Sequence, residues 1–321
     1  MAKIVCTSYL FSDQIDRMKA AGHKVWIHRG DEPVPRDRLV AELADAEGLI
    51  CLFTDRIDRE LLSAAPGLRV VANVAVGYEN IDVDTARERG IAVTNTPDVL
   101  TGSTADLTFA LLLAAARRIA EGDATVRRGE FPTWGLDQPL IGVDVHGKTL
   151  GIVGMGRIGT AVARRGRLGF GMRILYYNRT RNEEGERELA AERVSFHRLL
   201  AESDFVCVHV PLTDETRHLF DRDAFRWMKP TAVLVNVARG PVVDEAALVR
   251  ALEEGAIAGA GIDVFEHEPD VHPGLIRLRE QVVLTPHLGS ATRETRRSMA
   301  KLAVDNVLAV LSGEPPITPV G

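Results

Sequence analysis

Three glycines with regular spacing mark the first place in the chain where chemistry is expected. Gly154, Gly156 and Gly159 follow a short apolar run, Thr149 to Val153, and precede a helical pattern. In this G-x-G-x-x-G spacing the first glycine permits a tight turn, the second lets the backbone approach a diphosphate, and the third lets the helix pack close to the strand. The helix N-terminus then directs N–H groups at the anion. The sequence predicts a dinucleotide site here. The plainer alternative is a glycine-rich turn in an ordinary βα unit.

The end of the next strand bears on which dinucleotide is bound. It reads Asn178, Arg179, Thr180 and Arg181, with no acidic residue among them. An acid at this point usually holds the ribose hydroxyls and repels a 2′-phosphate. Arg179 can instead bind that phosphate with its fork of N–H groups, with Thr180 as a neutral partner. The sequence therefore favours NADPH over NADH. The alternative is that both arginines are surface charges and that the site accepts either cofactor.

Three further polar segments follow apolar strands in the second half of the chain. Arg239 follows one strand, Asp263 and Glu268 follow the next, and His287 follows a third. Open parallel sheets bind ligands at the carboxyl ends of their strands. An arginine suits a carboxylate beside a carbonyl, and a histidine next to a carboxylate can donate a proton to a developing alkoxide. Singly, each segment also has a structural interpretation: a salt bridge at a strand end, an acidic loop or a core histidine.

Length and charge narrow the class of protein. The chain has 321 residues and a net charge of −6, which predicts about two domains and no basic footprint for nucleic acid. The cysteines, Cys6, Cys51 and Cys207, are odd in number and lie in apolar runs, which is typical of reduced thiols in a cytoplasmic protein. The longest apolar run, Phe109 to Ala116, is too short to span a membrane. Because a strand is expected to begin at Lys3, we expect no signal peptide.

Strands and helices alternate along most of the chain, which predicts two parallel sheets with helices on both faces. The expected strands are Ile4–Ser8, Val25–His28, Gly48–Phe53, Arg69–Ala72, Ile91–Thr94, Thr149–Val153, Arg173–Tyr177, Phe205–Val208, Ala232–Asn236, Ala258–Ile262 and Val282–Thr285. A single long helix is expected from Ser103 to Arg128, with Ser103 and Asp106 as a capping box, followed by a loop to Asp144. A last helix, Thr292 to Leu311, could return to the first domain and make it discontinuous.

Several segments in a fixed order carry a family resemblance. They are Val76–Asp82, Gly147–Gly159, His209–Thr213, Asn236–Gly240, Asp263–Pro269 and Pro286–Ala291. With these motifs the chain resembles the D-isomer-specific 2-hydroxyacid dehydrogenases over nearly its whole length. The runs at 176–181 and 259–266 look most like the glyoxylate/hydroxypyruvate reductases of that family.

The resemblance implies roles for individual residues. Arg239, Glu268 and His287 would form the catalytic trio: Arg239 binds the substrate carboxylate and carbonyl, His287 donates the proton, and Glu268 pairs with His287. The substrate would also contact Leu52, the backbone amides of Val76 and Gly77, and Trp134, which resembles a tryptophan that reaches the partner subunit's active site. The alternatives are that Leu52 only packs in the core and that Trp134 only packs in the dimer interface. The cofactor would contact Thr104, Gly154, Met155, Gly156, Arg157, Ile158, Asn178, Arg179, Thr180, His209, Val210, Pro211, Val237, Ala238, Asp263 and Gly289.

We therefore expect an α/β protein of two Rossmann-like or flavodoxin-like domains with parallel sheets. The dinucleotide-binding domain, residues 99–287, would be inserted in a discontinuous substrate domain, residues 1–98 plus 288–321. The expected protein is a cytoplasmic homodimer without a metal or a nucleic-acid or membrane partner. It would reduce glyoxylate or hydroxypyruvate to the 2-hydroxy acid with NADPH, and with NADH less well. The alternatives are another D-2-hydroxyacid dehydrogenase, a phosphite dehydrogenase, or a dinucleotide-sensing corepressor.

Overall fold

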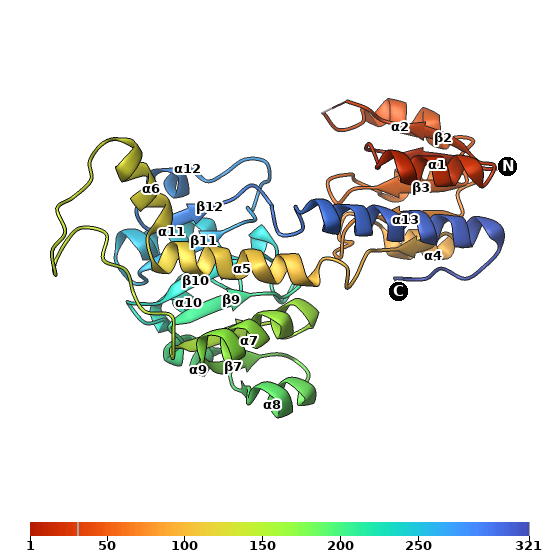
Figure 1. Cartoon of the computed structure of the whole chain (residues 1–321). Coiled ribbons are helices and arrows are strands. Elements are labelled where there is room, and N and C mark those ends of the chain that lie inside the picture. Colours follow the sequence, from red (N-terminus) through yellow and green to blue (C-terminus); the bar gives the residue numbers. More distant parts are fainter. Residues whose placement is uncertain (31, 321) are drawn as a thin grey trace. The chain divides into compact units, whose positions relative to one another are not determined.

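Two compact units make up the protein. The computed structural model describes residues 1–30 and 32–320. Contacts group Met1–Leu100 with the segment from Thr292 onward as unit 1, and Thr101–Ala291 as unit 2 (Figure 1). Unit 2 is therefore inserted in a discontinuous unit 1. The contacts change unit after residue 100 and after residue 291, whereas the sequence predicted domain boundaries after residues 98 and 287.

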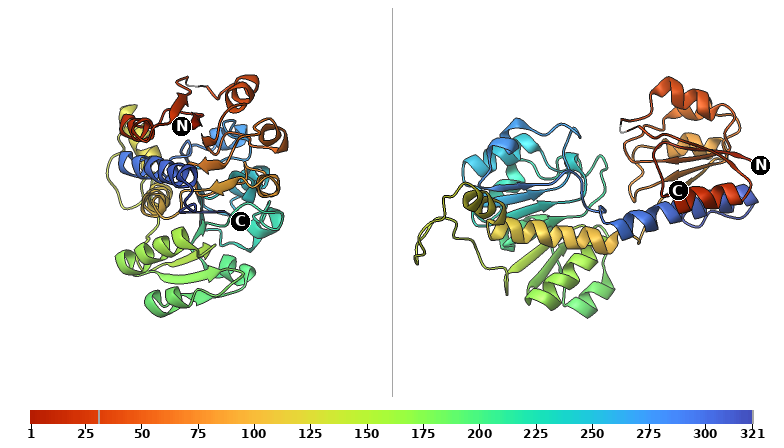
Figure 2. Two further views of the ribbon diagram at one scale, coloured as in Figure 1. Left: turned by 90° about the vertical axis from the view of Figure 1, so that its right-hand side faces the viewer. Right: turned by 45° about the horizontal axis from the view of Figure 1, so that its top comes forward.

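Unit 1 contains a five-stranded parallel sheet in the order β2-β1-β3-β4-β5. This order is that of flavodoxin-like sheets. The strands are β1 Lys3–Cys6, β2 Lys24–Ile27, β3 Gly48–Cys51, β4 Val70–Asn73 and β5 Ala92–Thr94; the helices are α1 Ser12–Ala20, α2 Arg36–Leu43, α3 Arg59–Ser63, α4 Val83–Glu88 and α13 Arg293–Ser312. Helices α1 and α13 lie side by side on one face of the sheet (Figure 2). Gly48 makes room for α13, because a Cβ there would lie 3.1 Å from Val307.

Unit 2 contains a seven-stranded parallel sheet in the order β12-β11-β10-β9-β6-β7-β8. The strands are β6 Thr149–Val153, β7 Arg173–Tyr177, β8 Glu192–Arg193, β9 Phe205–Val208, β10 Val233–Asn236, β11 Gly259–Ile262 and β12 Val282–Leu284. From β6 the chain runs to one edge through β7 and β8, and then returns to β9 and proceeds to the other edge. The carboxyl ends of β6 and β9 thus form a topological switch point, where open α/β sheets bind ligands.

Alternate residues of the buried strands in unit 2 belong to two separate cores. On β9, Phe205 and Cys207 join one cluster, and Val206 and Val208 join the other. Because side chains alternate across a strand, the two clusters cover opposite faces of the sheet. Helices α5 Thr101–Ala116 and α7 Arg157–Phe170 supply the first cluster, and α9 Phe196–Glu202, α10 Arg222–Trp227, α11 Glu245–Glu253 and α12 Pro273–Arg277 supply the second. Both parallel sheets confirm the predicted fold class.

The prediction of a single helix from Ser103 to Arg128 was wrong. The segment forms α5, which ends at Ala116, and α6 Ile119–Arg127, and Arg118 between them has a left-handed φ of 52°. The carbonyl of Ala116 accepts a hydrogen bond from the amide of Val143 (2.9 Å), so a distant part of the chain takes the place of the next helical turn.

The proposed capping box was also wrong. Helix α5 already begins at Thr101, so Ser103 lies inside its first turn. The Asp106 carboxylate accepts a hydrogen bond from Arg165 of α7 (2.8 Å). Asp106 therefore joins two helices, and it does not complete a cap.

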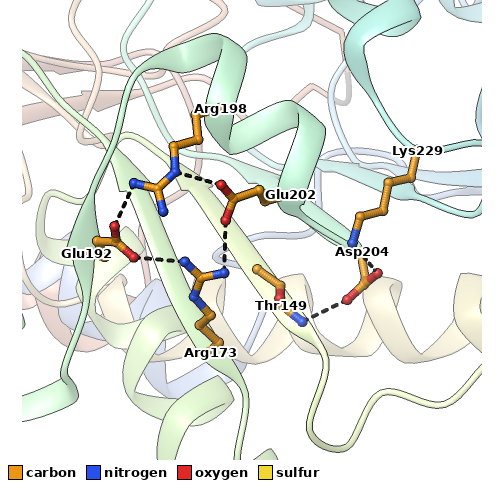
Figure 3. Close-up of polar contacts among 7 residues, drawn as sticks. All are labelled: Thr149, Arg173, Glu192, Arg198, Glu202, Asp204 and Lys229. Carbon is orange, nitrogen blue, oxygen red and sulfur yellow. Dashed lines mark hydrogen bonds and ion pairs between the residues drawn. The ribbon is translucent and has the colours of Figure 1, made fainter.

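A ring of four charged side chains ties β8 to the rest of unit 2 (Figure 3). Arg173 of β7 pairs with Glu192 and Glu202, and Arg198 of α9 pairs with the same two carboxylates, at 2.6–2.9 Å. These side chains are 34–48% exposed, so each pair is worth little alone, but the closed ring restrains this short edge strand. The sequence did not predict β8, nor α8 Glu183–Leu189 before it.

All three cysteines are buried thiols without a disulfide, as predicted. Burial raises the pKa of Cys6 to about 12 and also raises those of Cys51 and Cys207. None of these thiols is therefore a reactive thiolate at neutral pH.

Candidate active site

Three neighbouring strands of unit 2 end beside the residues predicted to do chemistry. Arg239 follows β10, Glu268 lies in the segment after β11, and His287 lies just after β12. The strands are adjacent and parallel, and their last residues pair in register. Their carboxyl ends therefore lie along one edge of the sheet, which brings together three segments that are about 20–30 residues apart in sequence.

His287 and Glu268 form a direct pair. Nδ1 of His287 lies 2.9 Å from Oε2 of Glu268, and Oε1 of Glu268 accepts a hydrogen bond from the amide of Phe265 (3.0 Å). Burial acts to raise the pKa of Glu268, but the His287 hydrogen bond and charge, the Phe265 amide and the charge of Arg239 together lower it below the ordinary value. Glu268 is thus a carboxylate at neutral pH. A carboxylate at this distance fixes the orientation of the imidazole ring.

Asp263 holds the segment that carries His287. Its buried carboxylate accepts hydrogen bonds from the amides of Leu288 (2.7 Å) and Gly289 (2.9 Å) and from the hydroxyl of Thr285 (2.6 Å). The backbone of His287 has a left-handed φ of 53°, which is uncommon outside glycine, and its amide donates to the Asp263 carbonyl (2.9 Å). Burial raises the pKa of Asp263 in spite of its three donors. The sequence assigned this residue to the cofactor. The structure gives it the task of shaping the histidine turn.

A tight approach between two segments positions Arg239. Asn236 accepts from the amide of Ala238 (3.1 Å) and donates to the carbonyl of Arg239 (3.0 Å), which closes a turn at the end of β10. A Cβ at Gly240 would lie 1.9 Å from the backbone of Phe265. Only glycine therefore lets the Arg239 turn pack against the segment that leads to Glu268. The contribution of Arg239 to the lowered pKa of Glu268 reflects this proximity.

The glycine turn after β6 fits a dinucleotide diphosphate. Gly154 has a φ of 98°, and a Cβ there would lie 2.6 Å from the backbone of His209 at the end of β9. A Cβ at Gly159 would lie 2.2 Å from the Gly154 carbonyl, so the helix packs directly on the turn. Gly156, the N-cap of α7, differs: a Cβ there would meet nothing within 4 Å, and no side chain caps the helix. Open space in front of a helix N-terminus is what an anionic diphosphate requires. Arg157 and Ile158 are the first two residues of that helix.

Two asparagines clamp the middle residue of the glycine turn. The amide of Met155 donates to Oδ1 of Asn178 (2.7 Å), and its carbonyl accepts from Nδ2 of Asn182 (2.9 Å). Its side chain is buried. Met155 therefore fixes the turn to the end of β7 and the start of α8, with its own polar groups already engaged. Asn182 was not among the predicted site residues. Its only sequence signal is its place before the acidic first turn of α8, where it is the N-cap.

The arginines after β7 differ in their partners. Arg181 is bound to Glu186, with a shortest distance of 2.6 Å. Arg179 and Thr180 are exposed, and the guanidinium of Arg179 has no hydrogen-bond or ion-pair partner among residues 1–30 and 32–320. A hydrogen bond from Thr213 lowers the pKa of Glu215, and the charge of Arg179 contributes to this shift. Of the two arginines, Arg179 is thus the one whose donors are available.

His209, Val210 and Pro211 lie at the switch point, directly after β9. Burial lowers the pKa of His209 to about 3, so its ring is neutral at any physiological pH. Nε2 of this ring is enclosed and has no hydrogen-bond partner in the described part of the chain. His209 is therefore not a proton donor, in contrast to His287 beside its carboxylate. Of the other residues assigned to the cofactor, Thr104 lies beside Gly289, while Val237 and Ala238 lead into Arg239.

In unit 1, the candidate substrate residues follow β3 and β4. The carbonyls of Val76 and Gly77 accept hydrogen bonds from Asn95 and Asn73, both at 2.7 Å. Their amide N–H groups have no acceptor in the parts of the chain described, so this turn presents two successive donors, which can hold a carboxylate. The amide of Leu52 donates to Asp55 (2.7 Å). In unit 2, Trp134 lies in the segment after α6 and is 77% exposed.

Comparison with known proteins assigns the family. Residues 109–289 match the model of the D-isomer specific 2-hydroxyacid dehydrogenase NAD binding domain. The chain belongs to this family. It is an NAD(P)-dependent 2-hydroxyacid dehydrogenase, as the resemblance implied.

Three individual proteins show how similar the chain is to known relatives. The chain is 54% identical over 299 residues to a glyoxylate reductase of Pyrococcus horikoshii, covering 92% of this chain and 88% of that one. A crystal structure of a protein from Thermus thermophilus is 47% identical with a TM-score of 0.92, covering 99% of this chain and all of that one. The NADPH-dependent glyoxylate/hydroxypyruvate reductase of Sinorhizobium meliloti, in complex with NADP and malonate, is 36% identical with a TM-score of 0.85, covering 100% and 97%.

Among residues 1–30 and 32–320, no group of three or more histidine, cysteine, aspartate or glutamate side chains is arranged to hold a metal ion. In the same part of the chain, no helix combines the length and the apolar character that a membrane crossing requires.

Proposed function

We propose that this dehydrogenase reduces glyoxylate, and hydroxypyruvate beside it, to the 2-hydroxy acid with NADPH as the preferred cofactor and NADH as the poorer one. The observation that carries the proposal is the His287–Glu268 pair beside Arg239, at the strand ends of a sheet whose glycine turn fits a diphosphate. The names of the relatives support the choice of substrate.

Each residue of the trio has a separate task in this mechanism. Arg239 binds the substrate carboxylate and polarises the neighbouring carbonyl. The nicotinamide, when bound, supplies the hydride that the carbonyl carbon accepts. Since Glu268 occupies Nδ1 of His287, the proton passes from Nε2 to the carbonyl oxygen as negative charge develops there. Glu268 remains ionised throughout and stabilises the imidazolium before the transfer.

Unit 1 contributes candidate substrate contacts of its own. The amides of Val76 and Gly77 would hold a carboxylate, and Leu52 would supply an apolar wall beside the small end of the substrate. The absence of any acceptor for these two amides among the described residues supports this assignment. Hydrogen bonds from neutral amides do not discriminate between glyoxylate and hydroxypyruvate, which differ by a hydroxymethyl group.

The preference for NADPH rests on Arg179. Its exposed guanidinium at the end of β7 lacks a carboxylate partner in the described chain, whereas Arg181 is bound to Glu186. Thr180 adds a neutral hydroxyl, and Asn178 connects this strand end to the glycine turn. Residues 178–181 contain no carboxylate that would repel a 2′-phosphate.

A homodimer forms part of the proposal. Phe131 and Trp134 are each 77% exposed and Leu136 is 91% exposed, and α6 before them has no buried residue. Large apolar side chains gathered in one segment indicate a surface that another protein covers. We assign it to a second copy, with Trp134 reaching the partner's substrate. Trp134→Ala should lower kcat/KM while sedimentation still shows a dimer. Loss of the dimer with unchanged kinetics per folded chain would limit Trp134 to packing.

Initial rates test the function directly. Oxidation of NADPH and of NADH is followed by absorbance with glyoxylate, hydroxypyruvate and pyruvate. We expect fast NADPH turnover with the first two acids, slow turnover with pyruvate, and slower rates with NADH. Turnover chiefly with NADH and larger 2-oxo acids would keep the trio but assign the enzyme to another branch of the family. If no combination of cofactor and 2-oxo acid is turned over, phosphite is the next substrate to test.

A further inference from the structure

One arginine outside the predicted site holds the strand end that carries Arg179. Arg193 belongs to β8, the edge strand of unit 2, and pairs in register with Tyr176 of β7. Its Nη2 donates to two successive carbonyls, that of Asn178 (2.9 Å) and that of Arg179 (2.7 Å). A single guanidinium nitrogen therefore binds both peptide groups at the point where β7 ends.

These two bonds fix the direction in which Arg179 leaves the sheet. Holding consecutive carbonyls restricts the backbone rotations of both residues, and hence the place where the Arg179 side chain begins. Asn178 is also tied to the glycine turn through the amide of Met155 (2.7 Å). The glycine turn itself is held at Met155 by the side chains of Asn178 and Asn182. Replacing Arg193 therefore frees the carbonyls at the end of β7 and leaves the bonds that hold the glycine turn in place.

Arg193 also lies near the carboxylates that follow this strand end. The first turn of α8 carries Glu183, Glu184 and Glu186. Hydrogen bonds from Arg181 and then Tyr176 lower the pKa of Glu186, and the charge of Arg193 adds to this effect, so Arg193 lies within the same electrostatic neighbourhood. Its Nε and Nη1 donate to no group among residues 1–30 and 32–320. Like Arg179, it is a cation without a carboxylate partner in the described chain.

We propose that Arg193 is a specificity-determining residue for the 2′-phosphate: it positions Arg179 through the two carbonyls and adds a second positive charge beside it. This inference rests on the NADPH preference proposed above. It distinguishes Arg193 from the other arginine next to β8, Arg198, which is bound to Glu192 and Glu202 (Figure 3).

The test measures binding of two adenosine ligands that differ by one phosphate. Adenosine 2′,5′-bisphosphate and 5′-AMP are titrated calorimetrically into the full-length wild type, Arg193→Met, Arg193→Gln, Arg179→Ala and the control Arg198→Met. We expect Arg193→Met to lower the affinity for the bisphosphate by about tenfold or more, which is the low end for the loss of a hydrogen bond to a charged group. The affinity for 5′-AMP should stay within about twofold of the wild type, as for an ordinary surface substitution. Arg193→Gln, which retains amide donors but no charge, should fall between the wild type and Arg193→Met.

Kinetics supply a second readout. In Arg193→Met the KM for NADPH should rise while the KM for NADH and both kcat values stay near those of the wild type. Arg198→Met should change none of them, because the Arg173–Glu192 pair still joins β8 to β7. Because Arg193 acts partly through Arg179, the double variant should lose less than the sum of the two single losses in binding free energy. Equal weakening of both adenosine ligands in Arg193→Met, or no weakening of either, would overturn the inference.

The outcomes separate this inference from the function on which it depends. If the wild type binds the bisphosphate no more tightly than 5′-AMP, the NADPH preference and the role of Arg193 both fail. If the wild type discriminates and Arg179→Ala abolishes the discrimination while Arg193→Met retains it, only the role of Arg193 fails.

Discussion

Replacing Glu268 by glutamine removes one charge and almost no volume, and it perturbs His287 most selectively. The pair is half-buried, with 2.9 Å between Nδ1 and Oε2 and side-chain exposures of 28% and 27%. A hydrogen bond to a charged group contributes about 1.5–3 kcal/mol net, so its loss at the transition state should lower kcat about 10- to 150-fold. The neighbouring Glu266 offers a matched control, because it forms a similar pair with His218 (2.5 Å).

The pH dependence adds a sign to this prediction. The pKa of Glu268 is below its ordinary value, so its carboxylate is present above that ordinary value and is lost only as the pH falls through the lowered one. The wild type should therefore keep its activity down to mildly acid pH.

Stopped-flow oxidation of NADPH with glyoxylate across pH measures this effect. Glu268→Gln should show the reduced rate at neutral pH, and Glu266→Gln should resemble the wild type. If Glu268→Gln retains the wild-type kcat within about twofold, or if Glu266→Gln loses as much, the reasoning about the pair is refuted.

Three further substitutions probe other parts of the site. Arg239→Lys should lower kcat/KM for glyoxylate, with a rise of about 2–4 kcal/mol in activation free energy, because an ammonium cannot bind both substrate groups. Near-wild-type kinetics would remove Arg239 from the mechanism. Arg179→Ala should raise the KM for NADPH far more than that for NADH, while Arg181→Ala should change neither; equal effects on both cofactors would mean that another residue holds the 2′-phosphate. Gly240→Ala should destabilise unit 2 by about 1–3 kcal/mol in urea unfolding, since its Cβ would lie 1.9 Å from the Phe265 backbone, and unchanged stability would contradict the close approach.

Local sequence patterns predicted the parts of the site that depend on strand ends. Gly154, Gly156 and Gly159 specify a turn and a helix start that need only a few consecutive residues. Arg239 and His287 each follow an apolar run, and the parallel topology alone brings such positions to one edge of a sheet. For this reason the sheet class was predictable, and so was the grouping of these strand ends.

Contacts between distant segments were not predicted from the sequence. Helix α5 ends where the Val143 amide bonds to the Ala116 carbonyl, and no helical pattern records such a contact. The Arg193 bonds to the end of β7 depend on a two-residue strand, too short to show any periodicity. The clamp of Asn182 on Met155 likewise joins residues 27 positions apart.

Asp263 illustrates a different limit. Its position after a strand predicted a polar residue at the site, but a position in the sequence does not distinguish a ligand contact from an internal one. The structure shows its carboxylate bonded to the turn that carries His287, at Thr285, Leu288 and Gly289. A residue of this kind can hold the geometry of the site without touching the reactants.

The central claim is that His287 donates the proton during reduction, and the pH–rate profile of His287→Asn tests it most directly. With NADPH and glyoxylate at saturation, the account predicts that the wild-type rate falls at alkaline pH, because the reduction consumes a proton that His287 delivers. In His287→Asn the activation free energy of reduction should rise by about 2–4 kcal/mol, and the fall in rate at alkaline pH should disappear. A variant that retains both the wild-type rate and the wild-type profile would contradict the account.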